Sequence, residues 1–431
     1  MQGGKLVKRY DYLIVGGGAG GAALAHFLSK STGGIASIAI AEKGRVERVG
    51  RLSDCFRYYD VRGMFRMPLS SIEGITIWQS CMAGGSTVIA CGNIARCLDE
   101  ELQSLGVDLS EHFAECEKEI GPAPIDESLL GTRSHRIREA ADNLGYAMNL
   151  MPKGILTTKC RKCGLCVFGC PYGAKWTSLD FIRSAKASGC VVQYNNKIEA
   201  VLHKGNRVQG VQLSNGEVIS SANVIVAAGG IHSALLLQKS GITNAGSKLF
   251  CDLLVNIYGR TRAPIHDKEP VMSLVKTEFY NQNGFILSPY IGESPAYRFL
   301  DAGVRSALRS PDRTMGMMVK IRDENTGIVF KDGRISKKPT TNDIAKLNMG
   351  IDISKQILAE AGAGDSMIIS KIHGAHPGGT CALGSVVDSN LQTEIQGLYV
   401  CDASVLPVSP GFPPILTISA LAHYLSTKLT A

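Results

Sequence analysis

A glycine-rich turn between an apolar strand and a helix constrains the fold of this chain most. The segments DYLIV, GGGAGG, AALAHFLSK and ASIAIAE, all between residues 10 and 42, predict a strand, a turn, a helix and a second strand. Gly16 would make the tight turn, Gly18 would let a pyrophosphate approach the backbone, and Gly21 would let helix and strand pack closely. Glu42 closes the second strand and would bind ribose hydroxyls. We therefore expect an α/β chain with a Rossmann-type dinucleotide-binding unit; the alternative is a glycine-rich turn without a ligand.

A run of cysteines forms the second motif, CRKCGLCVFGCP, with the spacing that holds a cubane iron–sulfur cluster. Its metal ligands would be Cys160, Cys163, Cys166 and Cys170. Gly164 and Gly169 lie inside the run, where a left-handed backbone costs least. In two-cluster ferredoxins the fourth cysteine of such a run ligates the other cluster, so a distant thiol is an alternative to Cys170. A structural zinc site and four unrelated buried thiols are the other interpretations, although zinc ligands usually come in two separated pairs.

The remaining chain alternates between helical and extended patterns. Residues 110–145 predict two helices, and further helices are expected at 177–186 and 342–360. Short strands with turn signals follow the cysteine run, and the last of them ends in a glycine turn before another helix. Residues 258–322 have a β-rich pattern, and GIVFKDGRISKK predicts a hairpin. This pattern indicates a second sheet, separate from the dinucleotide-binding unit.

Three stretches resemble the glucose-methanol-choline (GMC) flavoprotein oxidoreductases. They are the dinucleotide-binding turn, GGSTVIACGN at 84–93, and the C-terminal run that begins HPGGTCALG and ends in GFPPILTISALAHYL. Residues 333–363 are similar to the branch that contains long-chain alcohol oxidases. The resemblance implies FAD as the dinucleotide, and it makes this chain a short member with a ferredoxin-like cysteine motif. The expected fold is a Rossmann-type FAD-binding domain, a mainly antiparallel substrate domain and an inserted iron–sulfur segment.

The resemblance also divides the chain. The FAD-binding domain is expected in three parts, the cluster segment lies between the first two, and the substrate domain precedes the third. The expected ranges are 8–149, 185–257 and 372–431 for the FAD-binding domain, 150–184 for the iron–sulfur segment and 258–371 for the substrate domain.

By the same resemblance, His376 is the base that takes a proton from a substrate hydroxyl while a hydride passes to the flavin. His373 is expected to be structural. The family places Asn or His where this chain has Pro413, which offers no side-chain donor. Ser409 and Tyr424 are distant possibilities for a replacement. Further FAD contacts are expected from Gly84, Gly85, Ser86, Asp402, Thr417 and Ile418.

These features together predict an FAD-dependent dehydrogenase of an apolar alcohol. Its electrons would pass through a [4Fe-4S] cluster to a one-electron carrier such as ferredoxin or to a partner redox subunit, because an oxidase needs no cluster. The alternatives are an electron-transfer subunit without substrate chemistry and a flavin-dependent C=C reductase.

Composition limits the cellular location and the classes of partner that we expect. The chain has 431 residues, 45% of them hydrophobic, which is ordinary for an enzyme with two cores. Thirteen cysteines, no secretion-type leader and no apolar stretch of about 18 residues favour a cytoplasmic protein without a transmembrane segment. The net charge of +8 would fall to about +4 with cluster and FAD bound. With no basic run either, we expect no nucleic-acid partner.

Overall fold

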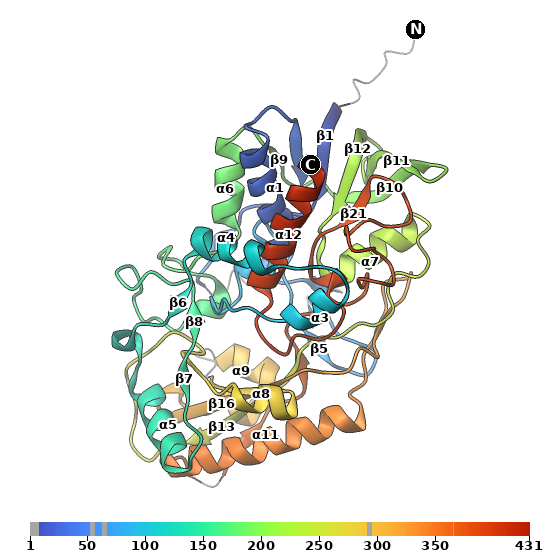
Figure 1. Ribbon diagram of the computed structural model, residues 1–431. Coiled ribbons are helices and arrows are strands. Elements are labelled where there is room, and N and C mark those ends of the chain that lie inside the picture. Colours follow the sequence, from blue (N-terminus) through green and yellow to red (C-terminus); the bar gives the residue numbers. More distant parts are fainter. Residues whose placement is uncertain (1–7, 52–56, 63–66, 291–294, 365) are drawn as a thin grey trace.

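The computed structural model describes residues 8–51, 57–62, 67–290, 295–364 and 366–431. Two sheets lie at opposite ends of the molecule, with helices on their outer faces (Figure 1). This is the mixed α/β architecture expected from the sequence, although no iron–sulfur segment is shown by it. The domain boundaries proposed above remain predictions.

The first sheet contains seven strands and is parallel around its centre. Its first strand pairs in parallel with two others, and the last residues of that strand are buried on both faces, as the apolar run LIV predicts. Two antiparallel strands extend one edge. The strands are β1 (Lys8–Val15), β2 (Ile38–Ala41), β9 (Val191–Gln193), β10 (Ile198–Lys204), β11 (Arg207–Leu213), β12 (Val218–Val226) and β21 (Leu398–Val400).

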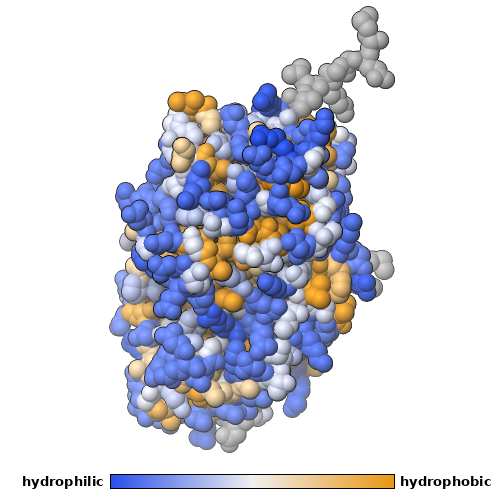
Figure 2. Space-filling model, turned by 45° about the vertical axis from the view of Figure 1, so that its right-hand side comes forward, coloured by the Kyte–Doolittle hydropathy of each residue, from blue (hydrophilic) through white to orange (hydrophobic). Residues whose placement is uncertain are grey.

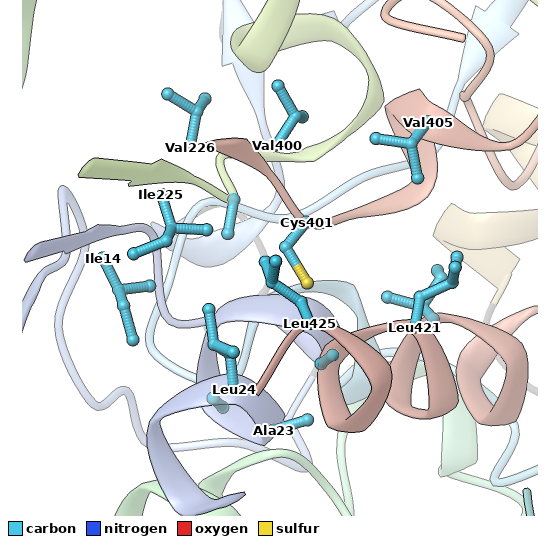
Figure 3. Close-up of a cluster of buried hydrophobic side chains, with 14 of the residues drawn as sticks. Ile14, Ala23, Leu24, Ile225, Val226, Val400, Cys401, Val405, Leu421 and Leu425 are labelled. Carbon is cyan, nitrogen blue, oxygen red and sulfur yellow. The ribbon is translucent and has the colours of Figure 1, made fainter. Parts of the chain in front are cut away.

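Helices α1 (Ala19–Ser31) and α12 (Ile415–Thr430) pack together against this sheet. Figure 3 shows Leu24 of α1 and Leu425 of α12 directed toward the end of β21, where Cys401 follows the strand. A Cβ atom on Gly20 would lie 1.8 Å from the carbonyl oxygen of Cys401, so α1 can approach this closely only with glycine there. The first and last helical elements of the chain thus close one core.

The second sheet contains six strands and is mainly antiparallel, as predicted. Alternate residues of the strand β16 (Thr314–Ile321) face opposite sides of this sheet. Met317 and Val319 pack toward the long helix α11 (Thr341–Glu360), and Met318 belongs to the core that includes the first sheet. The strands are β5 (Thr76–Ile77), β13 (Leu253–Arg260), β15 (Phe285–Pro289), β16 (Thr314–Ile321), β19 (Ile368–Ile369) and β20 (His373–Gly374).

Short pairs of strands complete the sheets of the described residues. They are β3 (Val61–Arg62) with β4 (Met67–Pro68), β6 (Ala123–Pro124) with β8 (Pro152–Lys153), β7 (Asn149–Leu150) with β14 (Leu274–Val275), and β17 (Ile328–Val329) with β18 (Ile335–Ser336). The last pair is the hairpin that GIVFKDGRISKK predicts.

The remaining helices confirm most of the sequence pattern. Those at 110–145, 177–186 and 342–360 form within one or two residues of the expected positions, whereas three short helices interrupt the region expected to be β-rich. The helices not yet named are α3 (Asp99–Ser104), α4 (Ser110–Ile120), α5 (Thr132–Asn143), α6 (Leu179–Ala187), α7 (Gly229–Lys239), α8 (Glu278–Asn283), α9 (Pro295–Ala302) and α10 (Val304–Ala307).

The surface is mainly hydrophilic on the face that Figure 2 shows, where hydrophobic residues gather in a band across the upper half. In the described part of the chain, none of the helices is both long enough and apolar enough to traverse a bilayer.

Candidate active site

A cavity of about 440 Å³ lies beyond the carboxyl ends of β1 and β2, the place where α/β sheets bind nucleotides. Most of the residues expected to bind FAD line it. They are Gly16, Gly18, Glu42, Gly85, Ser86, Asp402 and Ile418, together with the expected base His376. Gly21, Gly84 and Thr417 do not line it.

The first glycine turn has the geometry that its motif predicts. Gly16 has φ +105°, and a Cβ there would lie 2.3 Å from the carbonyl oxygen of Ala227. A Cβ on Gly21 would lie 2.0 Å from the oxygen of Gly16, so Gly21 serves the packing of helix on strand. Gly18 begins α1 without a side-chain cap. The first amides of α1 are therefore available to a phosphate group at the positive end of the helix dipole.

The second glycine turn packs directly on the first. The amide of Gly84 donates to the carbonyl oxygen of Gly17 at 2.9 Å, and Gly84 and Gly85 both have positive φ. A Cβ on Gly85 would lie 2.8 Å from the Cα of Gly18. Gly84 thus joins the two turns, while Gly85 and Ser86 face the cavity.

Glu42 is buried at the end of β2 and lines the cavity. One carboxylate oxygen accepts from the amide of Gly17 at 2.7 Å and the other from the amide of Gly44 at 2.6 Å. Burial raises the pKa of Glu42, and these two amides oppose the shift. Its contact with a ribose remains a prediction.

The three expected contacts near the C-terminus differ in placement. Asp402 lines the cavity, but its carboxylate accepts from the amides of Gly229 and Ser404, both at 2.8 Å, and so holds the start of α7. Ile418 also lines the cavity. Thr417 points away, because its hydroxyl donates to the carbonyl oxygen of Cys97 at 2.8 Å.

His376 lies at the cavity with one ring nitrogen fixed. Its Nδ1 is 2.7 Å from Oδ2 of Asp252. The side chain of Asp252 is fully buried, and its backbone has a φ of +47°. This contact makes Nδ1 the protonated nitrogen and leaves the lone pair on Nε2. Burial lowers the pKa of His376, the charge of Lys320 lowers it further, and Asp252 opposes both. The imidazole is therefore neutral near pH 7 and can accept a proton.

Asp252 is itself held in place by a buried polar cluster that the sequence did not reveal. Its Oδ1 accepts from the hydroxyl of Ser409 at 2.7 Å and from the amide of Gly411 at 2.9 Å. The Lys320 ammonium lies 4.0 Å from Oδ2. Asp252 is separated from His376 by 124 residues and stands in no recognisable motif, so only the folded chain reveals the pair.

Neither suggested replacement for the side chain absent at Pro413 is placed to act on a substrate. Ser409 is fully buried against Asp252, and the Tyr424 hydroxyl donates to the carbonyl oxygen of Ser389 at 2.9 Å. Pro414, not Pro413, lines the cavity. His373 is fully buried with Nε2 2.9 Å from Oδ1 of Asp301, which agrees with a structural role.

The four cysteines of the run line one small second cavity, each partly exposed. Gly164 and Gly169 have φ +72° and +82°, as the tight curl of the run requires. Among the described residues, no three His, Cys, Asp or Glu side chains are grouped so that they could hold a metal ion. The geometry therefore gives no support to a zinc site, and it does not show a cluster.

Protein-family models and known proteins are similar to this chain over most of its length. Residues 10–257 and 334–422 match the N- and C-terminal models of the GMC oxidoreductases. An uncharacterised protein of Methanocaldococcus jannaschii is 29% identical over 96% of this chain and 98% of its own length. A long-chain-alcohol oxidase of Arabidopsis thaliana is 25% identical over 97% of this chain and 67% of its own length.

The fold also has solved counterparts. The crystal structure of pyridoxine 4-oxidase from Mesorbium loti superposes with a TM-score of 0.72 at 16% identity, covering 97% of this chain and 99% of that one. At this level of identity the match demonstrates a shared fold, and it extends over both sheets.

Proposed function

Because the chain belongs to the GMC oxidoreductase family, we propose that it oxidises an alcohol, with FAD bound in the 440 Å³ cavity. When bound, FAD supplies the ring that accepts a hydride, chemistry that no side chain provides. The uncapped start of α1 and the two glycine turns fit a diphosphate, since a Cβ on Gly16 or Gly85 would meet backbone atoms. Glu42 fits the ribose of the same group.

The observation that carries the proposal is the hydrogen bond between His376 and Asp252 at the wall of this cavity. Asp252 holds the imidazole with Nδ1 protonated, so Nε2 accepts the hydroxyl proton of the substrate as the C–H bond is broken. Asp252 also stabilises the imidazolium that forms. One alcohol thus yields one carbonyl product, a proton on His376 and a hydride.

The substrate is an apolar alcohol. Besides His376, the cavity is lined by the apolar residues Ala375, Pro414, Ile415 and Ile418. Apolar walls favour a hydrocarbon chain over a sugar. The relatives named as long-chain-alcohol oxidases agree with this class.

The electrons leave one at a time, for a carrier protein of the ferredoxin class, in the cytoplasm. Support comes from the ferredoxin-type spacing of the cysteines, since an oxidase that reduces oxygen directly has no use for them. Lys159 and Arg161 are exposed beside the cysteine cavity and would attract an acidic carrier.

Anaerobic flavin bleaching tests the proposal. A series of primary alcohols of increasing chain length is mixed with purified protein, and the flavin absorbance is followed. We expect bleaching that strengthens with chain length, and a rate in His376→Ala lower by about 10²-fold or more, the usual contribution of a general base. His135→Ala removes an exposed histidine and serves as the control.

Three results would overturn the proposal in whole or in part. Failure of every alcohol to bleach a fully loaded flavin would favour an electron-transfer subunit or a C=C reductase. Bleaching of His376→Ala at the parent rate would remove His376 from the mechanism. Rapid oxygen consumption at the expense of carrier reduction would replace the carrier with oxygen, as in the relatives named oxidases.

A further inference from the structure

The helix pair α9–α10 carries a dense group of exposed apolar side chains. Phe299 of α9 is 54% exposed, and Val304 and Leu308, which begin and cap α10, are 57% and 82% exposed. Elsewhere among the described residues, no three large apolar side chains of such exposure fall within ten residues of sequence. Single exposed apolar side chains are ordinary, whereas a group of them marks a surface that contacts something apolar.

Helix α9 has one buried side and one exposed side. The buried side consists of Tyr297, Arg298 and Asp301. Successive residues of a helix are turned by about 100°, so Phe299 projects from the side opposite to these three. The burial of its inner side attaches α9 to the second sheet, and Phe299 therefore points away from the body of the molecule.

Helix α10 presents an apolar and basic side. Val304 and Leu308 are four residues apart and so lie on the same side of the helix, with the exposed Arg305 next to them. The buried Ser306 lies on the other side. Gly303 joins the two helices with φ +78°, a conformation that favours glycine, and α10 contacts α9. The two outer sides thus belong to one small surface.

Arginines without acidic partners surround these apolar side chains. The guanidinium of Arg309 donates to the carbonyl oxygens of Tyr258 at 3.0 Å and Ser366 at 2.7 Å. Burial lowers the pKa of Arg309, and the positive charges of Arg260 and Arg305 lower it further, so the three arginines lie near one another. No carboxylate of the described residues lies within 4.0 Å of any of the three; the arginines that form ion pairs are others.

The acidic residues of the segment do not offset this charge at the surface. Residues 297–313 contain two, Asp301 and Asp312. Asp301 is fully buried and accepts from the hydroxyl of Tyr258 at 2.6 Å. Asp312 is half-buried and bonded to the hydroxyl of Ser310. Lys371 adds an exposed positive charge beside α9, since its amide donates to the carbonyl oxygen of Asp301 at 3.2 Å.

We infer that the outer side of α9–α10 docks on an anionic membrane surface. Phe299, Val304 and Leu308 would enter the headgroup region, and Arg260 and Arg305 would face the lipid phosphates. A basic helix with aromatic and aliphatic side chains beside its charges lies in the interface of a bilayer. A bilayer supplies both the phosphates and the apolar layer that these two kinds of side chain require. Two copies of this chain would bring arginines against arginines, which opposes a dimer through this face.

The inner side of α9 leads toward the proposed active site. Nε2 of His373 is 2.9 Å from Oδ1 of Asp301, and the ring of Trp78 stacks on Tyr297 with centroids 5.7 Å apart. His376 follows His373 by three residues. One helix thus separates the docked side from the strand that precedes the base, so an apolar alcohol held in the bilayer would lie close to the site. This consequence rests on the proposed function, whereas the docking rests on α9–α10 alone.

Sedimentation with vesicles tests the docking without any substrate. The purified protein is mixed with vesicles of phosphatidylglycerol and phosphatidylcholine, or of phosphatidylcholine alone. We expect binding to the anionic vesicles, weakened by high salt. Leu308→Ser should lower the lipid affinity by about tenfold, the effect of exposing one leucine side chain, and Arg305→Gln by about fivefold. Ile35→Ser and Arg207→Gln change an exposed isoleucine and an exposed arginine elsewhere, and should bind like the parent.

Four outcomes would overturn the inference. The first is no binding to anionic vesicles at low salt. The second is parent-level binding in both Leu308→Ser and Arg305→Gln, because another surface would then be bound. The third is a loss in Arg305→Gln with none in Leu308→Ser and Phe299→Ser, which would favour an acidic protein as the partner. The fourth is self-association in lipid-free solution that Leu308→Ser abolishes, which would assign the face to a second copy.

The variant His376→Ala separates this inference from the proposed function. It lacks the base but keeps α9–α10, so it should bind anionic vesicles with the parent affinity. Failure of the alcohol chemistry with intact vesicle binding would leave the docking surface in place, and the reverse result would leave the chemistry in place.

Discussion

The two buried polar regions of this molecule differ in how their charges are balanced. Around His376, each buried ion has a partner: Asp252 has His376 and Lys320, and Asp323 has Lys337 at 2.7 Å. Around the cysteine run, Lys153 and Lys175 face only carbonyl oxygens, an amide and thiols. The ion pairs around His376 are neutralised by the protein's own side chains, so this site needs only to take up and release a proton. The second region instead contains two buried ammonium groups that donate to neutral acceptors.

The largest expected effect separates the ligands of the second region. If the cysteine run holds the [4Fe-4S] cluster that its spacing predicts, Cys170→Ala should lose at least one iron, since a site with three thiolates leaves one iron labile. Cys91→Ala, which removes a partly exposed thiol close to Cys166 but outside the run, should keep all of them. Iron and sulfide analysis measures both variants. Full iron in Cys170→Ala with loss in Cys91→Ala would assign the fourth ligand to Cys91.

The next largest effect is expected from a substitution that impairs the site around His376 and leaves the cysteine run unchanged. Asp252→Asn should slow flavin bleaching by about 10²-fold or more, because an amide no longer stabilises the imidazolium or enforces the Nδ1–H tautomer. Asn also tolerates the left-handed backbone of this position, at φ +47°, so the fold should persist. Stopped-flow bleaching gives the rate, and iron content gives the control. Parent rates in Asp252→Asn would show that His376 needs no partner.

The difference between the two regions also shows which features could be predicted from the sequence. The glycine turns were predictable because their spacing is a local motif, although the contacts that require glycine are partly distant: a Cβ on Gly21 would meet the oxygen of Gly16, whereas one on Gly16 would meet Ala227 and Ala228. The sheets followed from apolar periodicity. Thr417 shows the limit, because periodicity places a helix but does not say which side of its first turn faces the cavity, and the hydroxyl binds Cys97 instead.

Charge balance was outside the reach of the sequence altogether. Asp252, Lys320 and His376 come from three distant segments, and nothing next to Asp252 in CDLLVN marks it as functional. Lys153 and Lys175 look like surface lysines until the fold buries them. Such residues become informative only when burial and the identity of their neighbours are known, since an exposed lysine needs no partner.

The smallest expected effect is a shift in the pH dependence of the first region. Burial and the positive charge of Lys320 both lower the pKa of His376, and Asp252 opposes them. The base must be neutral to accept a proton, so bleaching should fall as the pH drops through an apparent pKa below the usual value of about 6.5. Lys320→Met removes a charge that disfavours the imidazolium. The pKa of His376 therefore rises, and the rate should be lost at a higher pH than in the parent.

Lys320→Arg keeps the positive charge and is the matched control, with a pH profile expected to follow the parent. The rate at high pH should change less than the profile, because Lys320 acts here on protonation and not on the hydride. Stopped-flow bleaching from pH 5 to 9 gives both quantities for each variant. A profile that stays fixed in Lys320→Met, or moves to lower pH, would mean that Lys320 does not tune His376 and that its nearness to Asp252 only balances a buried carboxylate.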